Sequence, residues 1–359
     1  MEEEGKKLLQ IFVDLLQSVK EIEVTLDIEN SNFKKGIFSN PFFQIDSWKP
    51  KYCFERRNGD VKDLFFSDYN NKNEKEIFRK LLKRKDLLRS YYGKSRNVNT
   101  VTALHSQKRC IFRTESVLEG RHVNGGVTFF RDNEPIKMMV LRREEVLKVF
   151  VHEMLHVLRP MLDDTNFSKT LRERSKGDFG WECWNSDIAK NEAYTEYDAT
   201  MLNIVFTCLE MNDEEGLLLP LLLKVETMRS VFVCRKLKEN IKKETTNGIA
   251  YYFLKTAGLL KNYTSEEFLN CNYSDLITDK FLSIINTKEK CDIFKEKYSL
   301  RMTLTDLMLN DNSLIPKEFN YLKINNDRTI FGCNGEVQRN TKRIERTKNL
   351  EKKTRKKII

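Results

Sequence analysis

Histidine is scarce in this chain, and features of several common protein classes are missing. Only 4 of the 359 residues are histidine, and no two of the eight cysteines form a C-x-x-C pair. Scattered cysteines of this kind are typical of reduced thiols in the cytoplasm or the nucleus. The apolar run from Leu217 to Leu223 is interrupted by Pro220 and is far too short to span a bilayer.

The N-terminal residues and the bulk composition point the same way. The segment Met-Glu-Glu-Glu-Gly-Lys-Lys is acidic and differs from a secretory signal peptide, which has a basic start and an apolar stretch. We therefore expect a cytoplasmic or nuclear protein without a membrane span. An apolar content of 40% is enough for a hydrophobic core, and 359 residues correspond to one large or two modest domains.

Positive charge is concentrated in the last residues of the chain. The net charge is +10, and residues 336–359 supply +7 of it through ten Lys or Arg and three Glu. The basic character of the whole chain therefore says little about its folded body. We expect this basic tail to be disordered and solvated. Contact with nucleic acid or an acidic partner, or a role in nuclear import, is the alternative.

Helical periodicity dominates the chain. Residues 5–23 and 74–91 have apolar side chains at helical spacing, and residues 217–308 are mostly helical in pattern, whereas residues 24–75 look irregular. Strand-like runs are confined to one region, at 98–104, 109–114, 123–130 and 138–141. The pattern predicts an α+β fold that is predominantly helical.

The central third of the chain is expected to carry two long helices. The first is predicted over residues 143–158 and ends before Pro160. A polar loop with a short helix is expected over 163–186. The second helix is expected to be capped by Ser186 or Asp187 and to end near Glu210.

The first of these helices contains the most informative segment, Val151-His152-Glu153-Met154-Leu155-His156-Val157. Residues four apart lie on one face of a helix, so both imidazoles can reach a single metal ion. Glu153 stands beside them, where it can take a proton from a coordinated water molecule. This is the His-Glu-x-x-His pattern of zinc-dependent hydrolases, with two zinc ligands and a general base.

The residues around this pattern also favour a metal. From Val146 to Leu158 every residue is apolar except Lys148 and the three motif residues. A helix that is apolar on nearly all sides is buried, and burying a carboxylate with two imidazoles is costly unless something compensates them. A divalent cation would do so. The alternative is a pair of core histidines bonded to backbone carbonyls, with Glu153 paired to an arginine.

The third metal ligand must be of another type, because no histidine follows His156. Arg159 and Leu162 stand where an extended histidine motif requires Gly and His. We expect a carboxylate, with Cys183 as the less favoured choice. The segment Asn191-Glu192-Ala193-Tyr194-Thr195-Glu196 offers Glu192 as this ligand, and Glu196 can accept the N–H of a ligand histidine. Glu196 as the ligand, with Glu192 supporting it, is the alternative.

Together the two segments resemble the gluzincin metallopeptidases, of which thermolysin is the familiar example. In that clan an Asn-Glu-x-x-Ser/Thr/Ala-Asp/Glu segment supplies the third ligand and a supporting acid, which correspond here to Glu192 and Glu196, with Asn191 beside them. The resemblance covers roughly residues 120–205. The interval of 36 residues from His156 to Glu192 is longer than in thermolysin, so no family within the clan follows from it.

The resemblance implies a fold, and together with the patterns along the chain it suggests a division into regions. It implies a zincin-like catalytic core with a short mixed sheet and an active-site helix, at residues 98–210. A helical or irregular region at 1–97 would precede the core, and a helical C-terminal subdomain at 211–335 and the basic tail at 336–359 would follow it.

The resemblance also implies hydrolysis of a peptide bond in a protein or peptide substrate, with one Zn²⁺ per chain held by His152, His156 and Glu192. Glu153 would act as the general base. Nothing resembles the amine-binding motif of an aminopeptidase, which favours an endopeptidase. A non-catalytic scaffold with a structural zinc site and a nucleic-acid-binding tail is the alternative. Such a site normally has a fourth protein ligand, and Glu153 would have no purpose there.

Two further roles are expected near the metal. The segment from His122 to Phe130 fits the strand that borders the cleft in gluzincins, where Asn124, Gly125 and Gly126 would contact an extended peptide. An ordinary strand entered through a Gly-Gly turn is the alternative. A donor to the developing oxyanion is also needed. The candidates that flank the ligand are Tyr194 and Tyr197, and the others are Tyr251, Tyr252, Arg172 and Arg174.

Overall fold

The computed structural model describes residues 1–18, 48–93, 97–106, 116–162, 165–181 and 186–287, together with Leu300 and Thr303. Within these residues the fold is α+β and mostly helical, as expected, with a short mixed sheet of five strands. Several expectations fall outside the described residues, namely the strand-like run at 109–114, the ligand alternative Cys183 and the basic tail at 336–359.

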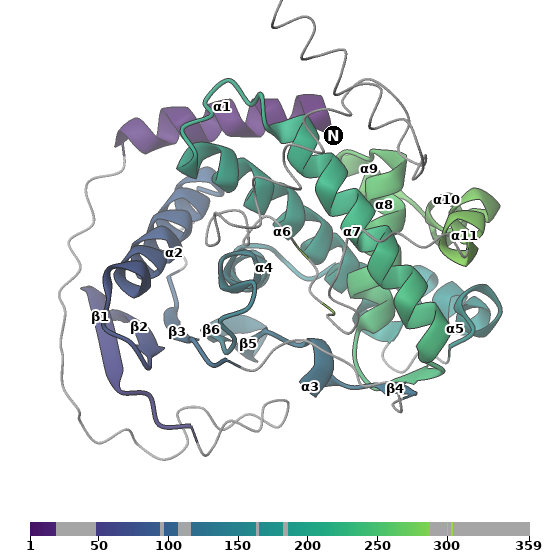
Figure 1. Cartoon of the computed structure of the whole chain (residues 1–359), viewed down its shortest axis with the longest axis horizontal. Helices are drawn as coiled ribbons and strands as arrows, with labels where there is room; N and C mark the ends of the chain where they lie inside the picture. Colours follow the sequence, from purple (N-terminus) through teal and green to yellow (C-terminus); the bar gives the residue numbers. More distant parts are fainter. Residues whose placement is uncertain are drawn as a thin grey trace, which may run out of the picture.

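The five-stranded sheet has the order β1-β2-β3-β6-β5 (Figure 1). The inner pairs β2–β3 and β3–β6 are parallel, whereas the outer pairs β1–β2 and β5–β6 are antiparallel. β5 therefore forms one edge of the sheet and runs against its neighbour. The strands are β1 (Tyr52–Asn58), β2 (Val61–Ser67), β3 (Asn99–Ala103), β5 (Gly126–Arg131) and β6 (Glu134–Val140). A separate pair joins β4 (Val117–Leu118) to β7 (Lys243–Glu244).

The hairpin of β1 and β2 corrects the expectation that residues 24–75 are irregular. Its turn contains Gly59, whose φ of 61° lies in the left-handed region that glycine adopts without strain. The charged residues of these strands hid the pattern. Arg56 is buried because its Nε donates to Asp63 at 3.0 Å and its Nη1 to Asp86 at 2.6 Å. Opposite charges thus neutralise one another across elements, which a one-dimensional pattern does not reveal.

Most of the long helices lie in the regions where the periodicity predicts helices, and their ends differ from the predicted ones. The N-terminal helices are α1 (Glu2–Ser18) and α2 (Lys72–Tyr91), and a short helix, α3 (Gly120–Val123), precedes β5. The central helices are α4 (Val146–Leu158), α5 (Thr165–Phe179), the 3₁₀ turn η1 (Ser186–Ile188) and α6 (Ala189–Glu210). The remainder are α7 (Leu219–Asn240), the π-helix η2 (Ile249–Leu254), α8 (Lys255–Lys261), α9 (Ser265–Asn270), α10 (Tyr273–Leu276) and α11 (Asp279–Asn286).

Three boundaries of these elements correct the sequence expectations. The strand expected from residue 123 begins at Gly126, because the preceding residues form α3. The helix expected from residue 143 begins at Val146, because Glu145 has a left-handed φ of 60° that no α-helix continues through. No side chain caps α6, and Asp187 instead pairs with Arg172 at 2.5 Å. The polar stretch 163–186 also contains a longer helix than expected, α5.

Helix α4 lies at the centre of the molecule, where Figure 1 shows it end-on between the sheet and α6. It contacts β5 and β6 on one side, α6 on the other, and α2. Helix α1 packs across α2, α6 and α7. Buried apolar side chains from these helices and from β6 form one large core cluster. The segment that carries the histidines is therefore enclosed by both the sheet and the helical layer.

None of the described helices combines the length and the apolar content needed to cross a membrane.

Candidate metal centre

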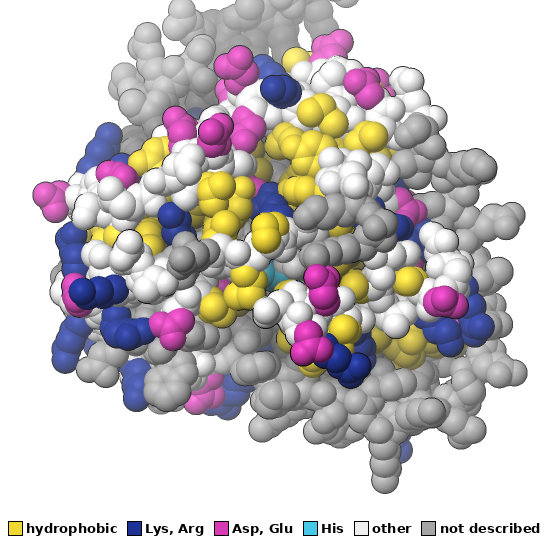
Figure 2. Space-filling view, turned by 180° about the vertical axis from the view of Figure 1, so that it is seen from behind, with side chains coloured by type: hydrophobic (Ala, Val, Ile, Leu, Met, Phe, Trp, Pro, Cys, Tyr) yellow, Lys and Arg dark blue, Asp and Glu magenta, His cyan; other side chains and the backbone are white. Residues whose placement is uncertain are grey.

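The centre is built on the buried helix α4. Every residue from Val146 to Leu158 is buried except His156, whose side chain is 12% exposed. The expectation of a buried helix is thus confirmed. His152 and His156 lie one turn apart and face α6, the helix that carries Glu192. In the face opposite to that of Figure 1, a histidine side chain is visible in a narrow depression bordered by hydrophobic side chains (Figure 2).

Three donor atoms from these two helices converge. The Nε2 atoms of His152 and His156 are 3.1 Å apart, and Glu192 Oε2 lies 3.4 Å from the first and 3.5 Å from the second. Four ligands at about 2.0–2.1 Å from a tetrahedral zinc ion lie about 3.3 Å from one another. The spacing of the three atoms therefore fits a single zinc-sized ion. Among the described residues, this is the one group of three such side chains that could hold a metal.

The bonding of Glu192 provides a second test of the fit. Its Oε2 atom is buried, and apart from the two histidine nitrogens at 3.4 and 3.5 Å it has no hydrogen-bond partner. A buried carboxylate oxygen without a partner is rare, because its lost hydration must be replaced. Two imidazole nitrogens and one such oxygen are the donors that zinc takes in a catalytic site with three protein ligands. The residues present thus fit a divalent ion, and Glu192 is the carboxylate in position to complete the set.

Glu196 has a different position from Glu192. Its Oε2 lies 3.0 Å from His152 Nδ1, on the side of the ring away from the cluster. This contact fixes which histidine nitrogen is available to a metal. Its Oε1 pairs with the ammonium groups of Lys148 and Lys255, the second at 3.6 Å. Glu196 therefore orients His152, and the geometry does not favour the alternative in which Glu196 would itself bind a metal.

Glu153 points from the same helix toward the edge strand β5. Thr128 of β5 donates its hydroxyl to Glu153 Oε2 at 2.7 Å. No arginine pairs with Glu153 in the described structure, in contrast to the alternative considered from the sequence. Gly126, at the start of β5, lies against this side chain so closely that a Cβ atom there would be 2.6 Å from Glu153 Cγ. The Gly-Gly segment thus makes room for the glutamate.

The protonation of the cluster is controlled by burial and by mutual pairing. Burial opposes charge on His152, but Glu192 and Glu196 outweigh it and raise the pKa of His152 to about 9. Burial would raise the pKa of Glu192, yet His156 and His152 hold it well below its ordinary value. Burial also opposes charge on Glu196, and Lys148, His152 and Lys255 lower its pKa. Glu153 differs, because its neighbours do not outweigh the effect of burial and its pKa is raised.

The tyrosines expected near the ligand occupy different positions. The ring of Tyr251, in the π-helix η2, lies edge-on to His152 with centroids 5.9 Å apart. Single π-helical turns are frequent at functional sites. The hydroxyl of Tyr197 donates to the backbone oxygen of Tyr263 and is not available to the cluster. Tyr194 lies under the guanidinium of Arg159, 4.8 Å from its ring centroid, and borders a cavity that also contacts His156.

The other residues predicted near the site make hydrogen bonds or ion pairs with other parts of the fold. Asn191 accepts the backbone N–H of Leu162 at 3.3 Å, which ties α6 to the loop after α4. Asn124 accepts a hydrogen bond from Thr246 at 3.1 Å, and the backbone oxygen of Gly125 accepts from Leu141 N. Tyr252 donates its hydroxyl to Leu300. Arg172 and Arg174 are exposed on α5, where they pair with Asp187 and Asp178.

Three residues of the centre were not expected from the sequence, namely Lys148, Lys255 and Thr128. A signal existed for Lys148, which is the lone cation of a buried apolar helix and lies one turn before His152. Such a charge requires an acidic partner nearby. Thr128 and Lys255 carry no such signal, because each reaches the site from an element distant in the sequence.

Comparison of the chain with protein-family models, with curated proteins and with solved structures finds no match in any of the three. A function for this chain therefore has to follow from the chemistry of its site.

Proposed function

We propose that the protein is a zinc-dependent peptidase with a zincin-like core. The observation that carries this proposal is an open set of three donors, His152, His156 and Glu192, with the buried carboxylate of Glu153 beside it. Catalytic zinc sites have three protein ligands and keep the fourth position for water or substrate. Among the described residues no fourth His, Cys, Asp or Glu joins the group, which argues against a closed structural site.

A zinc ion held there would lower the pKa of a coordinated water molecule to about 7 and polarise a substrate carbonyl. Glu153 is placed to accept a proton and to return it to a leaving amine. Its raised pKa suits this double role, because a general base works best when its pKa approaches the working pH. Thr128 holds one oxygen of the carboxylate, so the side chain keeps a single orientation. We assign the oxyanion donor role to Tyr251, whose ring lies against His152.

The edge strand β5 provides a platform for the substrate. No further strand pairs with its outer side among the described residues. An exposed edge can bind an extended peptide through backbone hydrogen bonds. β5 also carries Thr128, so the strand that would bind the peptide orients the base as well. A mixed sheet with an antiparallel edge strand beside the metal-binding helix supports the zincin-like assignment.

The test compares two variants of the metal centre with a matched control. Glu153→Gln should keep one zinc per chain and lose cleavage of casein or of a peptide library, whereas His152→Ala should lose both. Glu215→Gln, at an exposed glutamate on a loop, should behave as the unmodified chain. A zinc chelator should abolish cleavage. Full peptidase activity in Glu153→Gln would contradict the proposal, and stoichiometric zinc without any proteolysis would favour the non-catalytic scaffold.

A further inference from the structure

Helix α2 carries a concentration of positive charge that the metal centre does not use. The helix contains eight Lys or Arg and three Asp or Glu, which is a net charge of +5. Residues 1–335 together carry only +3, so the rest of this part of the chain is slightly negative. Figure 1 shows α2 on one flank of the molecule, opposite to α5 and α11. The positive charge of residues 1–335 is therefore local to one helix.

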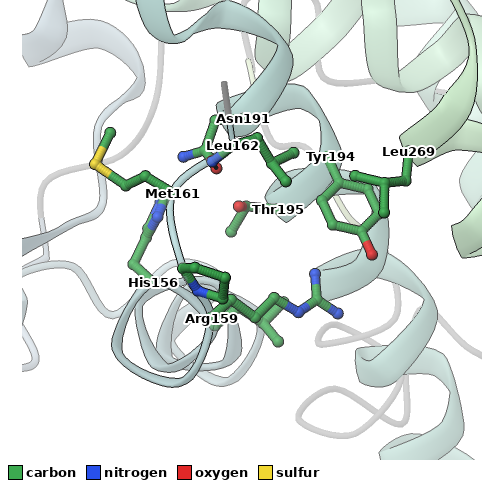
Figure 3. Close-up of a pocket in the computed structure, with 10 residues that line it drawn as sticks. His156, Arg159, Met161, Leu162, Asn191, Tyr194, Thr195 and Leu269 are labelled. Carbon is green, nitrogen blue, oxygen red and sulfur yellow. Dashed lines mark hydrogen bonds between the residues drawn. The ribbon is translucent and has the colours of Figure 1, made fainter. Parts of the chain in front are cut away.

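Cations that point into the protein have carboxylate partners. On α2, Arg84 pairs with a glutamate of α6 at 2.8 Å, and Lys85 pairs with Asp63 at 2.6 Å. Arg159, which borders the cavity drawn in Figure 3, contacts the carboxylate of Asp198 in the same way. These pairs neutralise charges that burial would otherwise make costly. Their role is therefore within the fold.

The cations on the outer side of α2 differ in this respect. Lys72, Arg79 and Lys83 are seven and four residues apart, a spacing that places them on one stripe of the helix. All three are exposed. Among the described residues no carboxylate pairs with Lys72 or Lys83, and Arg79 has only an exposed contact with Glu76 at 3.9 Å. Such a surface pair contributes little in water, so the charge of this α2 stripe is available to a partner.

An exposed aromatic ring precedes the α2 stripe. Tyr69 lies three residues before Lys72, and 57% of its surface is exposed. The guanidinium of Arg143 is 5.6 Å from the centroid of its ring, and the same arginine pairs with Glu74 of α2 at 2.6 Å. A flat ring beside a fixed guanidinium is the kind of surface on which a nucleobase stacks. The outer side of α2 thus combines aligned cations with an aromatic group.

The composition of this surface distinguishes between acidic partners. A helix that binds a membrane inserts apolar side chains, but the Ile, Leu and Phe side chains of α2 are all buried, namely Ile77, Phe78, Leu81, Leu82, Leu87 and Leu88. An acidic peptide would pair with the cations and would give Tyr69 no base to stack on. In a duplex the bases are already stacked and cannot reach a protein ring. A single strand offers both regularly spaced phosphates and free bases, which match the two features of the surface.

We propose that the α2 stripe and Tyr69 bind single-stranded nucleic acid, with the three cations on phosphates and the tyrosine ring on a base. A helix rises about 1.5 Å per residue, so neighbouring cations of the stripe are about 10 and 6 Å apart along its axis. These intervals exceed the roughly 3.4 Å rise per nucleotide of one strand, and each cation can therefore contact a different phosphate. The inference is independent of the metal centre and of peptide-bond hydrolysis.

The first test removes the charges of the α2 stripe from the whole chain. Fluorescence anisotropy measures the binding of labelled oligo-dT and oligo-rU of about twelve nucleotides. The combined variant Lys72→Gln, Arg79→Gln and Lys83→Gln should bind both at least about tenfold more weakly. The slope of log Kd against log salt should fall by about 2, which corresponds to three lost phosphate contacts on a single strand.

The control removes the same number of charges at another place. Lys169→Gln, Arg172→Gln and Lys176→Gln take three exposed cations from α5 and should leave the affinity and the salt slope close to those of the unmodified chain. Both combined variants keep the basic tail at 336–359. A difference between them therefore reports on α2 and not on overall charge. Circular dichroism and thermal unfolding check that both variants remain folded.

The second test concerns the aromatic ring. Tyr69→Ala should weaken binding by about fivefold to a hundredfold, because stacking on a base is lost, and should leave the salt slope unchanged. Tyr69→Trp keeps a flat ring at an exposed position and should retain the affinity. Oligonucleotide binding should be the same with zinc and with a chelator, because none of these residues belongs to the metal centre.

The results distinguish this surface from the other candidates. Equal losses in the α2 and α5 variants, or no loss in the α2 variant, would overturn the proposal, because binding would then depend on overall charge or on the tail. A duplex that binds as tightly as the single strands, or unchanged affinity in Tyr69→Ala, would overturn the assignment to a single strand. Phosphatidylserine vesicles that bind through the α2 stripe, without any binding of oligonucleotides, would show a membrane surface instead. A preference for oligo-dT or for oligo-rU would support the proposal and identify the strand as DNA or RNA.

Discussion

Gly126 and Glu153 approach each other so closely that no larger side chain fits between them. A Cβ atom built on residue 126 would lie 2.6 Å from Glu153 Cγ and 2.7 Å from Glu153 Oε1. Real Cβ atoms do not make contacts this short, so one of the two groups would have to move. Because the backbone of β5 is held by its pairing with β6, the side chain of Glu153 would yield.

Gly126→Ala is therefore expected to displace the carboxylate of Glu153 and to leave the metal ligands in place. A displacement of about 1 Å at a catalytic group lowers the rate by roughly a hundredfold. We expect this loss in kcat, with one zinc still bound per chain, as measured by peptide cleavage and metal analysis. Gly177→Ala is the matched control, because nothing lies within 4 Å of a Cβ atom there. Unchanged kcat in Gly126→Ala would show that Glu153 is not the base.

The hydroxyl of Thr128 should contribute to the reaction rate through its hydrogen bond to Glu153. Thr128→Val keeps the shape of the side chain and removes the donor. A hydrogen bond to a charged group contributes about 1.5–3 kcal/mol, so kcat/KM should fall by about tenfold to a hundredfold. The acid limb of the pH–rate profile should also shift upward, since the carboxylate loses a stabilising donor. Thr128→Ser restores the hydroxyl and should recover most of the rate. Equal activity of the Val and Ser variants would remove Thr128 from the site.

The buried contact between Lys148 and Glu196 should contribute to stability and to metal affinity. Lys148→Met leaves Glu196 with fewer cations at a site where both side chains are fully enclosed. Removing one partner of a buried ion pair costs about 3–5 kcal/mol, with Lys255 reducing that loss here. The double variant Lys148→Met with Glu196→Gln should lose less stability than the sum of the two single variants, because both changes remove the same ion pair. Urea unfolding measures the free energy of unfolding of each variant. Strictly additive losses would contradict this coupling.

The pH dependence of the metal-free protein follows from His152. Its pKa is about 9 in the folded chain, against an ordinary value of 6.5. The proton on His152 therefore stabilises the fold fully below pH 6.5, and this contribution is lost as the pH rises through 9. With a chelator present, the free energy of unfolding should fall across this window. Removal of the imidazole in His152→Gln should flatten that fall, and identical slopes in both proteins would contradict the assignment.

Zinc binding should show the opposite pH dependence. A metal ion can use the Nε2 atom of His152 only after the proton has left, so binding at pH 7 should release a proton. The apparent affinity for zinc should then rise with pH up to about 9, where His152 loses its proton without help. Calorimetry in buffers with different heats of ionisation measures the protons released. Affinity that is constant between pH 6.5 and 9 would show that His152 is neutral in the metal-free site.

Tyr251→Phe separates a catalytic hydroxyl from a packing role. The ring would remain against His152, so zinc content and stability should stay close to those of the unmodified chain. Loss of one oxyanion donor typically lowers kcat by about a hundredfold to a thousandfold, with little change in KM. Tyr194→Phe is the matched control, because Tyr194 lies under Arg159 and not beside His152. If only Tyr194→Phe reduces kcat, the donor is on the other side of the cluster.

Much of the candidate site could be predicted because its chemistry is local. His152, Glu153 and His156 lie within five consecutive residues, and helical geometry alone places the two imidazoles on one face. Because no histidine follows His156, a carboxylate is expected as the third ligand. The Asn191–Glu196 segment contains two, Glu192 and Glu196. The sequence favoured Glu192 and left Glu196 as the alternative, because the final choice depends on how far α6 is rotated against α4.

The sequence predicts the fold class, α+β and mostly helical, but not every element of the fold. Strong helical periodicity identified the long helices, whose apolar faces pack on the core. The hairpin of β1 and β2 was missed because Arg56 and Asp63 neutralise each other inside it. Local patterns treat such residues as exposed, although pairing across the sheet allows them to be buried.

The sequence by itself determined a helix with two histidines on one face and a glutamate next to the first of them, because one turn of helix fixes those distances. Only the tertiary structure decided what surrounds that helix. Contacts of Glu153 with Gly126 and Thr128, and of Glu196 with Lys255, join residues that are far apart in the chain. Their proximity depends on the packing of α4 between β5 and α6, which is a property of the whole core and not of any short segment.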